Sequence, residues 1–80
     1  MLSEKIKEKL AVSFLKADIK IFTSDDKHFN IVILSDDFKD KSLVERQKLI
    51  YDVIGEYITT GELHAVSLKT YTYDELSKDI

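Results

Sequence analysis

The two histidines of this chain are its best candidates for binding a metal or exchanging a proton near neutral pH. His28 follows a stretch of turn composition, residues 24–27, and stands directly before a nearly continuous apolar run, residues 29–34. His64 stands near the start of a second strand-like run, residues 63–70. Each histidine is therefore expected at the entry of a strand, where a side chain is both fixed by the backbone and exposed.

The two imidazoles would lie together if these strands are parallel neighbours, because their entry ends then share one edge of the sheet. Neighbouring strands are about 4.8 Å apart, so His28 and His64 would be close enough to serve one metal centre or to brace one another. Two alternatives stay open: His64 as a structural histidine bonded to a neighbouring carbonyl, and His28 as a simple strand cap. Two histidines without a cysteine are too few for a closed structural zinc site.

Hydrophobic spacing predicts the elements that position these histidines. In the first segment, apolar residues recur every fourth position, which indicates an amphipathic helix that ends near Leu15. Residues 17–21 alternate as a half-buried strand does, and the β-branched run at residues 29–34 is typical of a central strand. The third strand is expected at residues 63–70.

The second helix has the clearest local signals. Ser42 and Glu45 have the spacing of a capping box, and Gly61 can end the helix in the left-handed conformation. Thr72 and Glu75 repeat the capping-box spacing for a short closing helix through Ser77. The apolar face expected for the second helix comprises Leu43, Gln47, Ile50, Ile54 and Ile58.

The order is therefore helix, strand, strand, helix, strand, helix. The short connection makes the first two strands antiparallel, and the long helix returns the third strand parallel to the second by a right-handed crossover. The expected fold is a single α+β domain, residues 1–80, with a three-stranded mixed sheet. The strand at residues 29–34 is expected at the centre of the sheet, with the helices on one face.

Length and composition restrict the function classes. A chain of 80 residues, 44% hydrophobic and 34% charged, indicates one small soluble domain. No apolar run approaches the roughly 18 residues of a membrane span, and no secretory signal is evident, which indicates a cytoplasmic protein. A chain without cysteine can supply no thiolate, so any iron-sulfur cluster must take its thiolates from a partner. The sequence has no glycine-rich phosphate-binding loop, and its serines have no evident histidine and acid to complete a catalytic triad. We therefore do not expect this chain to be an enzyme.

From about His28 to Leu76 the chain resembles the BolA family. The family's helix tyrosine corresponds to Tyr51, and its histidine strand opens with Leu63-His64-Ala65 and closes with Lys69-Thr70. The loop before the helix follows Phe38 and matches except that the family's glycine is Asp40. Two further departures are Arg46-Gln47-Lys48 for an arginine-histidine-arginine run and Tyr73 for a proline.

The resemblance implies a fold like that of BolA, itself similar to the type II KH arrangement, and it implies a function. The family histidine that matches His64 is the signature ligand of a 2Fe-2S cluster shared with a monothiol glutaredoxin, whose cysteine and bound glutathione supply thiolates. The second ligand comes from the loop between the first two strands, where His28 is the candidate. Asp25 and Asp26 are harder oxygen donors that suit such a centre poorly. We expect an adaptor in iron homeostasis or cluster delivery, without a cofactor when isolated and then a monomer or weak homodimer.

Two other functions stay open. Some family members regulate transcription or belong to the stress response, and Lys41, Arg46 and Lys48 could form a basic patch for DNA at the second helix, although such charges are commonly a solvated face. The net charge of −3 and the acid Asp40 make DNA binding weak, and no Gly-x-x-Gly loop is present to hold a nucleic-acid backbone. The other alternative is a metal-free interaction module that docks a partner along the edge of the third strand.

Overall fold

The helices and strands follow the predicted order. In the computed structural model, which describes residues 1–78, the observed bounds lie within two residues of the expected ones. Among the described residues, no helix combines the length and the apolar character needed to cross a membrane. The elements are α1 (Leu2–Ser13), β1 (Asp18–Phe22), β2 (His28–Leu34), the short 3-10 helix η1 (Asp36–Phe38), α2 (Leu43–Thr59), β3 (Ala65–Tyr71) and α3 (Tyr73–Lys78).

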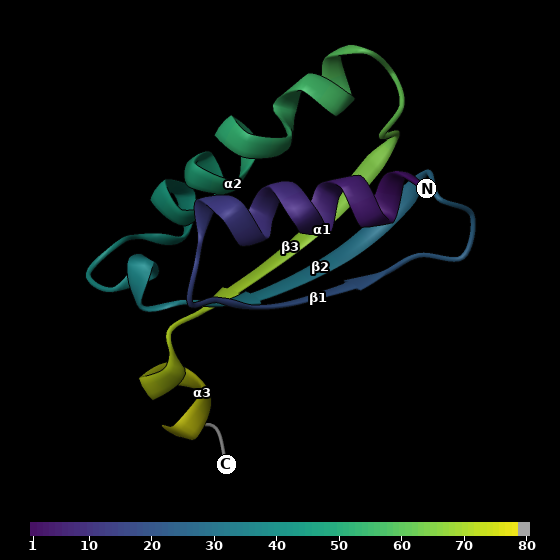
Figure 1. The fold of residues 1–80 in the computed structure, drawn as a ribbon. Coiled ribbons are helices and arrows are strands. Elements are labelled where there is room, and N and C mark those ends of the chain that lie inside the picture. Colours follow the sequence, from purple (N-terminus) through teal and green to yellow (C-terminus); the bar gives the residue numbers. More distant parts are fainter. Residues whose placement is uncertain (79–80) are drawn as a thin grey trace.

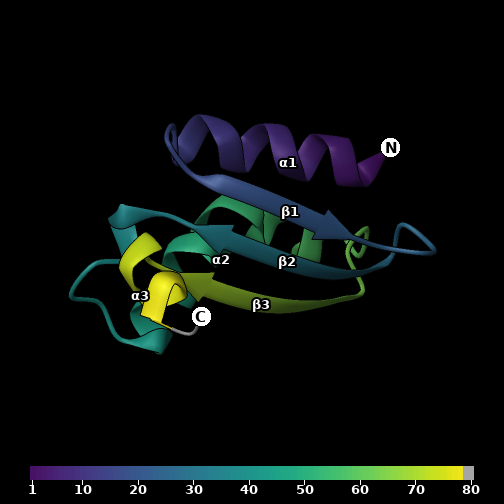
Figure 2. The same cartoon turned by 90° about the horizontal axis from the view of Figure 1, so that it is seen from below.

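The sheet has the predicted mixed topology, with β2 between β1 and β3. β1 pairs with β2 antiparallel, so that Ile19 lies opposite Ile33. β3 pairs with β2 parallel, so that His28 lies opposite Ala65. Figure 1 shows α1 and α2 over one face of the sheet and α3 beyond the end of β3. The other face is seen in Figure 2, where α3 lies at one end.

The core lies between the sheet and the first two helices. The stripe predicted for α1 is buried along its length, and Ile50 and Ile54 of α2 are fully buried as predicted. The prediction was wrong for the ends of the α2 face, because Leu43 is 60% exposed and Ile58 is 41% exposed. These two residues lie in the terminal turns of a 17-residue helix, and its last turns rise away from the sheet (Figure 1).

Local hydrogen bonds cap the first turns of α2 and α3 as the sequence predicts. At α2, the N–H of Glu45 donates to the Ser42 hydroxyl over 3.2 Å, and the N–H of Ser42 donates to the Glu45 carboxylate over 2.9 Å. At α3, Thr72 and Glu75 form the same reciprocal pair of bonds. Gly61, after α2, has a φ of 82°, which is the left-handed conformation expected there.

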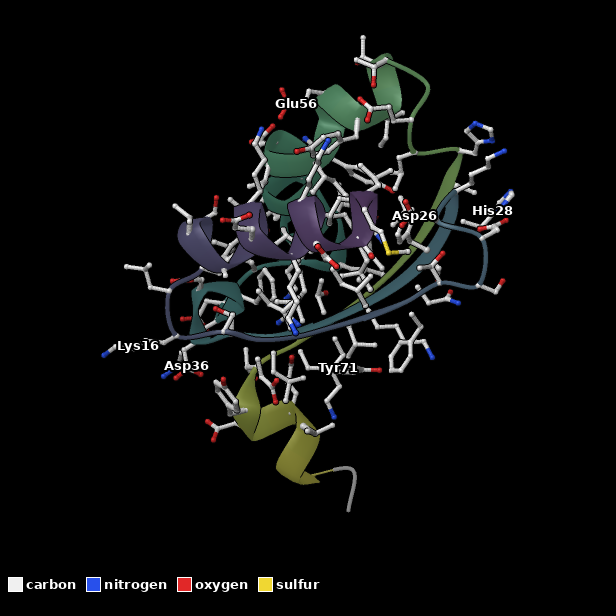
Figure 3. The ribbon with its side chains drawn as sticks, turned by 45° about the vertical axis from the view of Figure 1, so that its right-hand side comes forward. Lys16, Asp26, His28, Asp36, Glu56 and Tyr71 are labelled. Atoms are coloured by element: carbon white, nitrogen blue, oxygen red, sulfur yellow. The ribbon has the colours of Figure 1, made fainter. Side chains whose placement is uncertain are left out.

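The first turn of α1 is capped from a distant loop. The N–H groups of Leu2 and Ser3 donate to the Asp26 carboxylate over 2.9 and 3.1 Å. These bonds, the first of them above all, hold the pKa of Asp26 below its ordinary value. Figure 3 shows Asp26 beside the first turn of α1, at the end of the sheet where His28 also lies. The loop that leads into His28 is therefore fixed to α1.

Candidate functional site: the two-histidine edge of the sheet

His28 and His64 lie at the same edge of the sheet. His28 is the first residue of β2, and His64 comes directly before β3. The main-chain N–H of His64 donates to the carbonyl of Lys27 over 2.9 Å, which holds the two segments side by side. The imidazole ring centres are 6.0 Å apart, with their planes at 84°. The structure therefore brings the two rings together as the parallel crossover predicts.

The register explains how the two rings meet. Alternation along β2 and β3 assigns His28 to the uncovered face of the sheet, and it would assign His64 to the helix-covered face with Val66. His64, however, comes before the first residue of β3, and His28 is paired with that first residue, Ala65. His64 therefore does not have to follow the alternation of side chains along β3, and its ring can lie toward His28.

The imidazole of His28 is held by Asp25. Its Nδ1 lies 2.6 Å from Asp25 Oδ2, while the other carboxylate oxygen accepts the N–H groups of Lys27 and His28 over 3.0 and 2.9 Å. The main-chain N–H of His28, followed by its imidazole, holds the pKa of Asp25 well below its ordinary value. The His28 side chain is nevertheless 62% exposed, so a partner molecule can reach it.

His64 has a different setting. Its residue is exposed, and within the described part of the chain its imidazole makes no hydrogen bond or ion pair. The main-chain N–H, rather than the ring, bonds the neighbouring carbonyl of Lys27. The contact expected of a structural histidine is therefore missing among the described residues, and both ring nitrogens of His64 are available to a ligand.

These two rings could supply half of a metal site but not a whole one. Among residues 1–78, no three side chains of histidine, cysteine, aspartate or glutamate are grouped to hold an ion. Two imidazoles that bind one metal through nitrogens about 2 Å away have ring centres about 5 Å apart. The observed 6.0 Å is about 1 Å longer than this separation. The pair therefore fits a centre whose remaining ligands come from another molecule.

A hollow borders His28 on the uncovered face of the sheet. It has a volume of about 700 Å³. Phe22, one of its lining side chains, is 54% exposed. The hollow gives an incoming molecule both an apolar contact and direct access to the His28 ring. Its other exposed lining residues include Thr23, Ser24, Asn30, Ala65 and Ser67.

The three cations predicted as a DNA-binding patch are not equivalent. Lys48 is exposed and Lys41 is half-buried, but Arg46 is only 9% exposed. The Arg46 guanidinium donates to both carboxylate oxygens of Glu75 over 2.7 and 2.9 Å, and to the carbonyls of Lys41 and Thr70 over 3.0 and 3.3 Å. Arg46 therefore does not belong to the expected patch, because its donors bind groups inside the molecule and cannot meet a phosphate.

Asp25 is the site residue that sequence reasoning missed. It was considered only as a direct metal ligand, for which its oxygens are poorly suited. The available signal was its spacing, because an aspartate three residues before a histidine in a short turn can accept both main-chain and ring N–H groups.

Comparison with known proteins identifies relatives of this chain. The family model described as "BolA-like protein" matches residues 4–75. The acid stress protein IbaG of Escherichia coli K12 is 35% identical over 57 residues, which are 71% of this chain and 68% of IbaG. The DNA-binding transcriptional regulator BolA of the same strain is 30% identical over 84 residues, covering 94% of this chain and 79% of BolA.

The fold is also that of solved relatives. The structure of BolA1 from Arabidopsis thaliana matches with a TM-score of 0.82 and 31% sequence identity, over 94% of this chain and 95% of the other.

Proposed function

Because this chain belongs to the BolA family, we propose that it is a non-catalytic adaptor that binds a monothiol glutaredoxin and shares a glutathione-ligated 2Fe-2S cluster with it. Its role would be iron homeostasis or iron-sulfur cluster delivery. The proposed setting is the cytoplasm, where glutathione is abundant and keeps thiols reduced. The adaptor alone would be a monomer or a weak homodimer without a cofactor.

One observation carries the proposal: two exposed imidazoles, 6.0 Å apart, in a chain that has no cysteine. Nitrogen ligands without thiolates cannot hold an iron-sulfur cluster alone, so a partner that brings thiolates is the chemistry that this edge would complement. The hollow beside His28 offers such a partner an adjoining contact surface.

The chain's own residues would act by binding and orientation. His28 and His64 would each present one neutral ring nitrogen, and the hydrogen bond from His64 N–H to Lys27 would keep their backbones side by side. A bound 2Fe-2S cluster would supply an exchangeable iron-sulfur unit, with a reduction potential raised by imidazole in place of thiolate. Exposure of both rings would leave the centre open to transfer.

Reconstitution tests this function. The chain is mixed with a monothiol glutaredoxin, iron, sulfide and glutathione, and visible absorption and circular dichroism are recorded. His64→Ala should remove or strongly change the spectrum of the mixed complex while far-ultraviolet dichroism stays that of a folded domain. Glu62→Ala is the matched control, because Glu62 is an exposed residue two positions before His64. An unchanged coloured complex with His64→Ala would reject the ligand role and favour the metal-free interaction module.

DNA-binding regulation is a second candidate, favoured by the similarity to Escherichia coli BolA, which is named a DNA-binding transcriptional regulator. A role in the stress response is likewise suggested by the name of IbaG. Burial of Arg46 leaves Lys41 and Lys48 as the cations of the expected patch, and the chain carries a net charge of −3. Weak, salt-sensitive DNA binding is therefore what this second candidate predicts.

A further inference from the structure

Asp25 accepts three hydrogen bonds from the segment that it begins. Its Oδ1 receives the N–H groups of Lys27 and His28, and its Oδ2 faces His28 Nδ1 over 2.6 Å. One short side chain therefore fixes both the backbone and the ring of His28. The carboxylate is 44% exposed, and among the described residues it forms no three-residue metal-binding group with the two histidines.

The chemistry of Asp25 determines which nitrogen of His28 carries the hydrogen. An ionised carboxylate has no hydrogen to donate, and it can only accept. Nδ1 of His28 must therefore donate to Oδ2, and in the neutral ring Nε2 then keeps the lone pair. Within the described residues Nε2 has no hydrogen-bond partner.

We propose that Asp25 is a positioning residue that sets His28 as an Nε2 ligand for the centre shared at this edge. The inference rests on the proposed function and adds to it the ligating atom and the residue that selects it. Metal-binding histidines commonly donate their other ring N–H to a carboxylate, which fixes the ring and makes the ligating nitrogen more basic.

The surrounding loop makes this orientation rigid before any metal arrives. The hydroxyl of Thr23 donates to the carbonyl of His28 over 2.8 Å and accepts the N–H of Asp26 over 2.9 Å. The loop is also fixed to α1 by the Asp26 carboxylate. His28 is therefore held from its backbone and its ring, whereas the His64 ring has no such support among the described residues. Of the two candidate ligands, His28 is the one whose direction is set in advance.

Asp25→Asn tests the proposal in the metal-free chain. Asparagine can keep one oxygen for the N–H groups of Lys27 and His28 and so preserve the turn. Its amide NH₂ would then face Nδ1 and donate to it, which moves the ring hydrogen to Nε2. Nitrogen-15 NMR of the imidazole at a pH where it is neutral should show the hydrogen on Nδ1 in the wild type and on Nε2 in Asp25→Asn. Glu62→Gln removes an exposed negative charge from the segment before β3, and it should leave the tautomer unchanged.

The second readout is the shared cluster with a monothiol glutaredoxin. Asp25→Asn should change its visible dichroism toward that of His28→Ala and shorten its lifetime several-fold, and it should have no further effect when combined with His28→Ala. The proposal is overturned if the tautomer does not change in Asp25→Asn, or if the tautomer changes and the cluster spectrum does not. Failure of the wild type to assemble any cluster would instead reject the proposed function, and with it the ligand role of Nε2, even where NMR confirms the hydrogen on Nδ1.

Discussion

Arg46→Ala is expected to destabilise the domain much more than removal of an ordinary surface arginine. The Arg46 bonds to the carbonyls of Lys41 and Thr70 contribute about 1 kcal/mol each. The bidentate pair with Glu75 adds a smaller share, because that carboxylate is 45% exposed and water competes for it. The expected loss in the free energy of unfolding is therefore about 2 to 3 kcal/mol at pH 7. The stability of Arg46→Lys should lie between those of the wild type and Arg46→Ala, since an ammonium cannot form the planar, bidentate pair with a carboxylate.

The pH dependence isolates the charged part of this loss. The side-chain bonds from Arg46, more than any other contact, lower the pKa of Glu75 from 4.5 to about 2. A carboxyl with a lowered folded-state pKa stabilises the fold fully above its ordinary pKa and loses this contribution as pH falls toward the lowered value. The difference between wild type and Arg46→Ala should accordingly be constant from pH 7 to about 5 and become smaller between pH 5 and 2.

Urea unfolding followed by circular dichroism measures both effects, with the denaturant slope checked for constancy. Lys48→Ala is the matched control, because Lys48 lies two residues further along α2 and is exposed. A loss below about 0.5 kcal/mol for Arg46→Ala, within the usual range for surface substitutions, would refute the argument that the buried hydrogen bonds of Arg46 stabilise the domain. A loss that stayed the same from pH 7 to pH 3 would assign it to the bonds with the two carbonyls and to packing of the side-chain stem rather than to the ion pair.

Three more outcomes follow from the same structure. Gly55→Ala should raise the free energy of unfolding by about 0.5 to 1 kcal/mol, because Gly55 lies inside α2 and an added Cβ meets nothing within 4 Å. Gly61→Ala should lower it by about 1 kcal/mol, because Gly61 has a φ of 82°, and equal effects in urea unfolding would contradict the left-handed assignment. Duplex DNA should bind weakly and lose most of its affinity between about 50 and 200 mM salt, measured by fluorescence anisotropy, with Lys48→Ala weakening it for all sequences. Tight, sequence-selective binding at physiological salt would instead favour the regulator.

The sequence predicted those parts of the fold that depend on neighbours along the chain. Both capping boxes form, because Ser42 with Glu45 and Thr72 with Glu75 need only a three-residue spacing. The face of α2 was predicted correctly only in its middle. Whether the terminal turns are covered depends on how far the sheet extends beneath them, and the spacing of apolar residues along the helix does not predict that extent.

Arg46 shows what local patterns cannot predict. Its partner Glu75 is 29 residues away, and nothing in the spacing of either residue indicates a bidentate pair. Glu75 also accepts the N–H of Thr72, so one carboxylate both caps α3 and holds α3 to α2. The sequence indicated only the first of these roles. Arg46 was consequently expected at the surface with Lys41 and Lys48, where an isolated basic residue on a helix is usually found.

The same limit applies to the histidine edge. Closeness of His28 and His64 could be predicted, because parallel neighbouring strands begin at the same edge of the sheet. The orientation of the rings could not, since it depends on a register in which Ala65 rather than His64 pairs with His28. The role of Asp25 depends on the geometry of the loop, which includes a positive φ of 60° at Asp26 that composition alone does not specify.

Stability and site chemistry are separated along the sheet. Arg46 contacts Thr70, the sixth residue of β3, whereas the histidine edge lies at Ala65, the first residue. At about 3.3 Å per residue, roughly 17 Å of strand separates these two positions. Effects of substitutions this far apart without shared partners usually add. Arg46→Ala should therefore lower stability without moving the His28 tautomer in the folded protein, and Asp25→Asn should move the tautomer with little change in stability. Strong coupling between these two substitutions would mean that the sheet transmits strain from one end to the other.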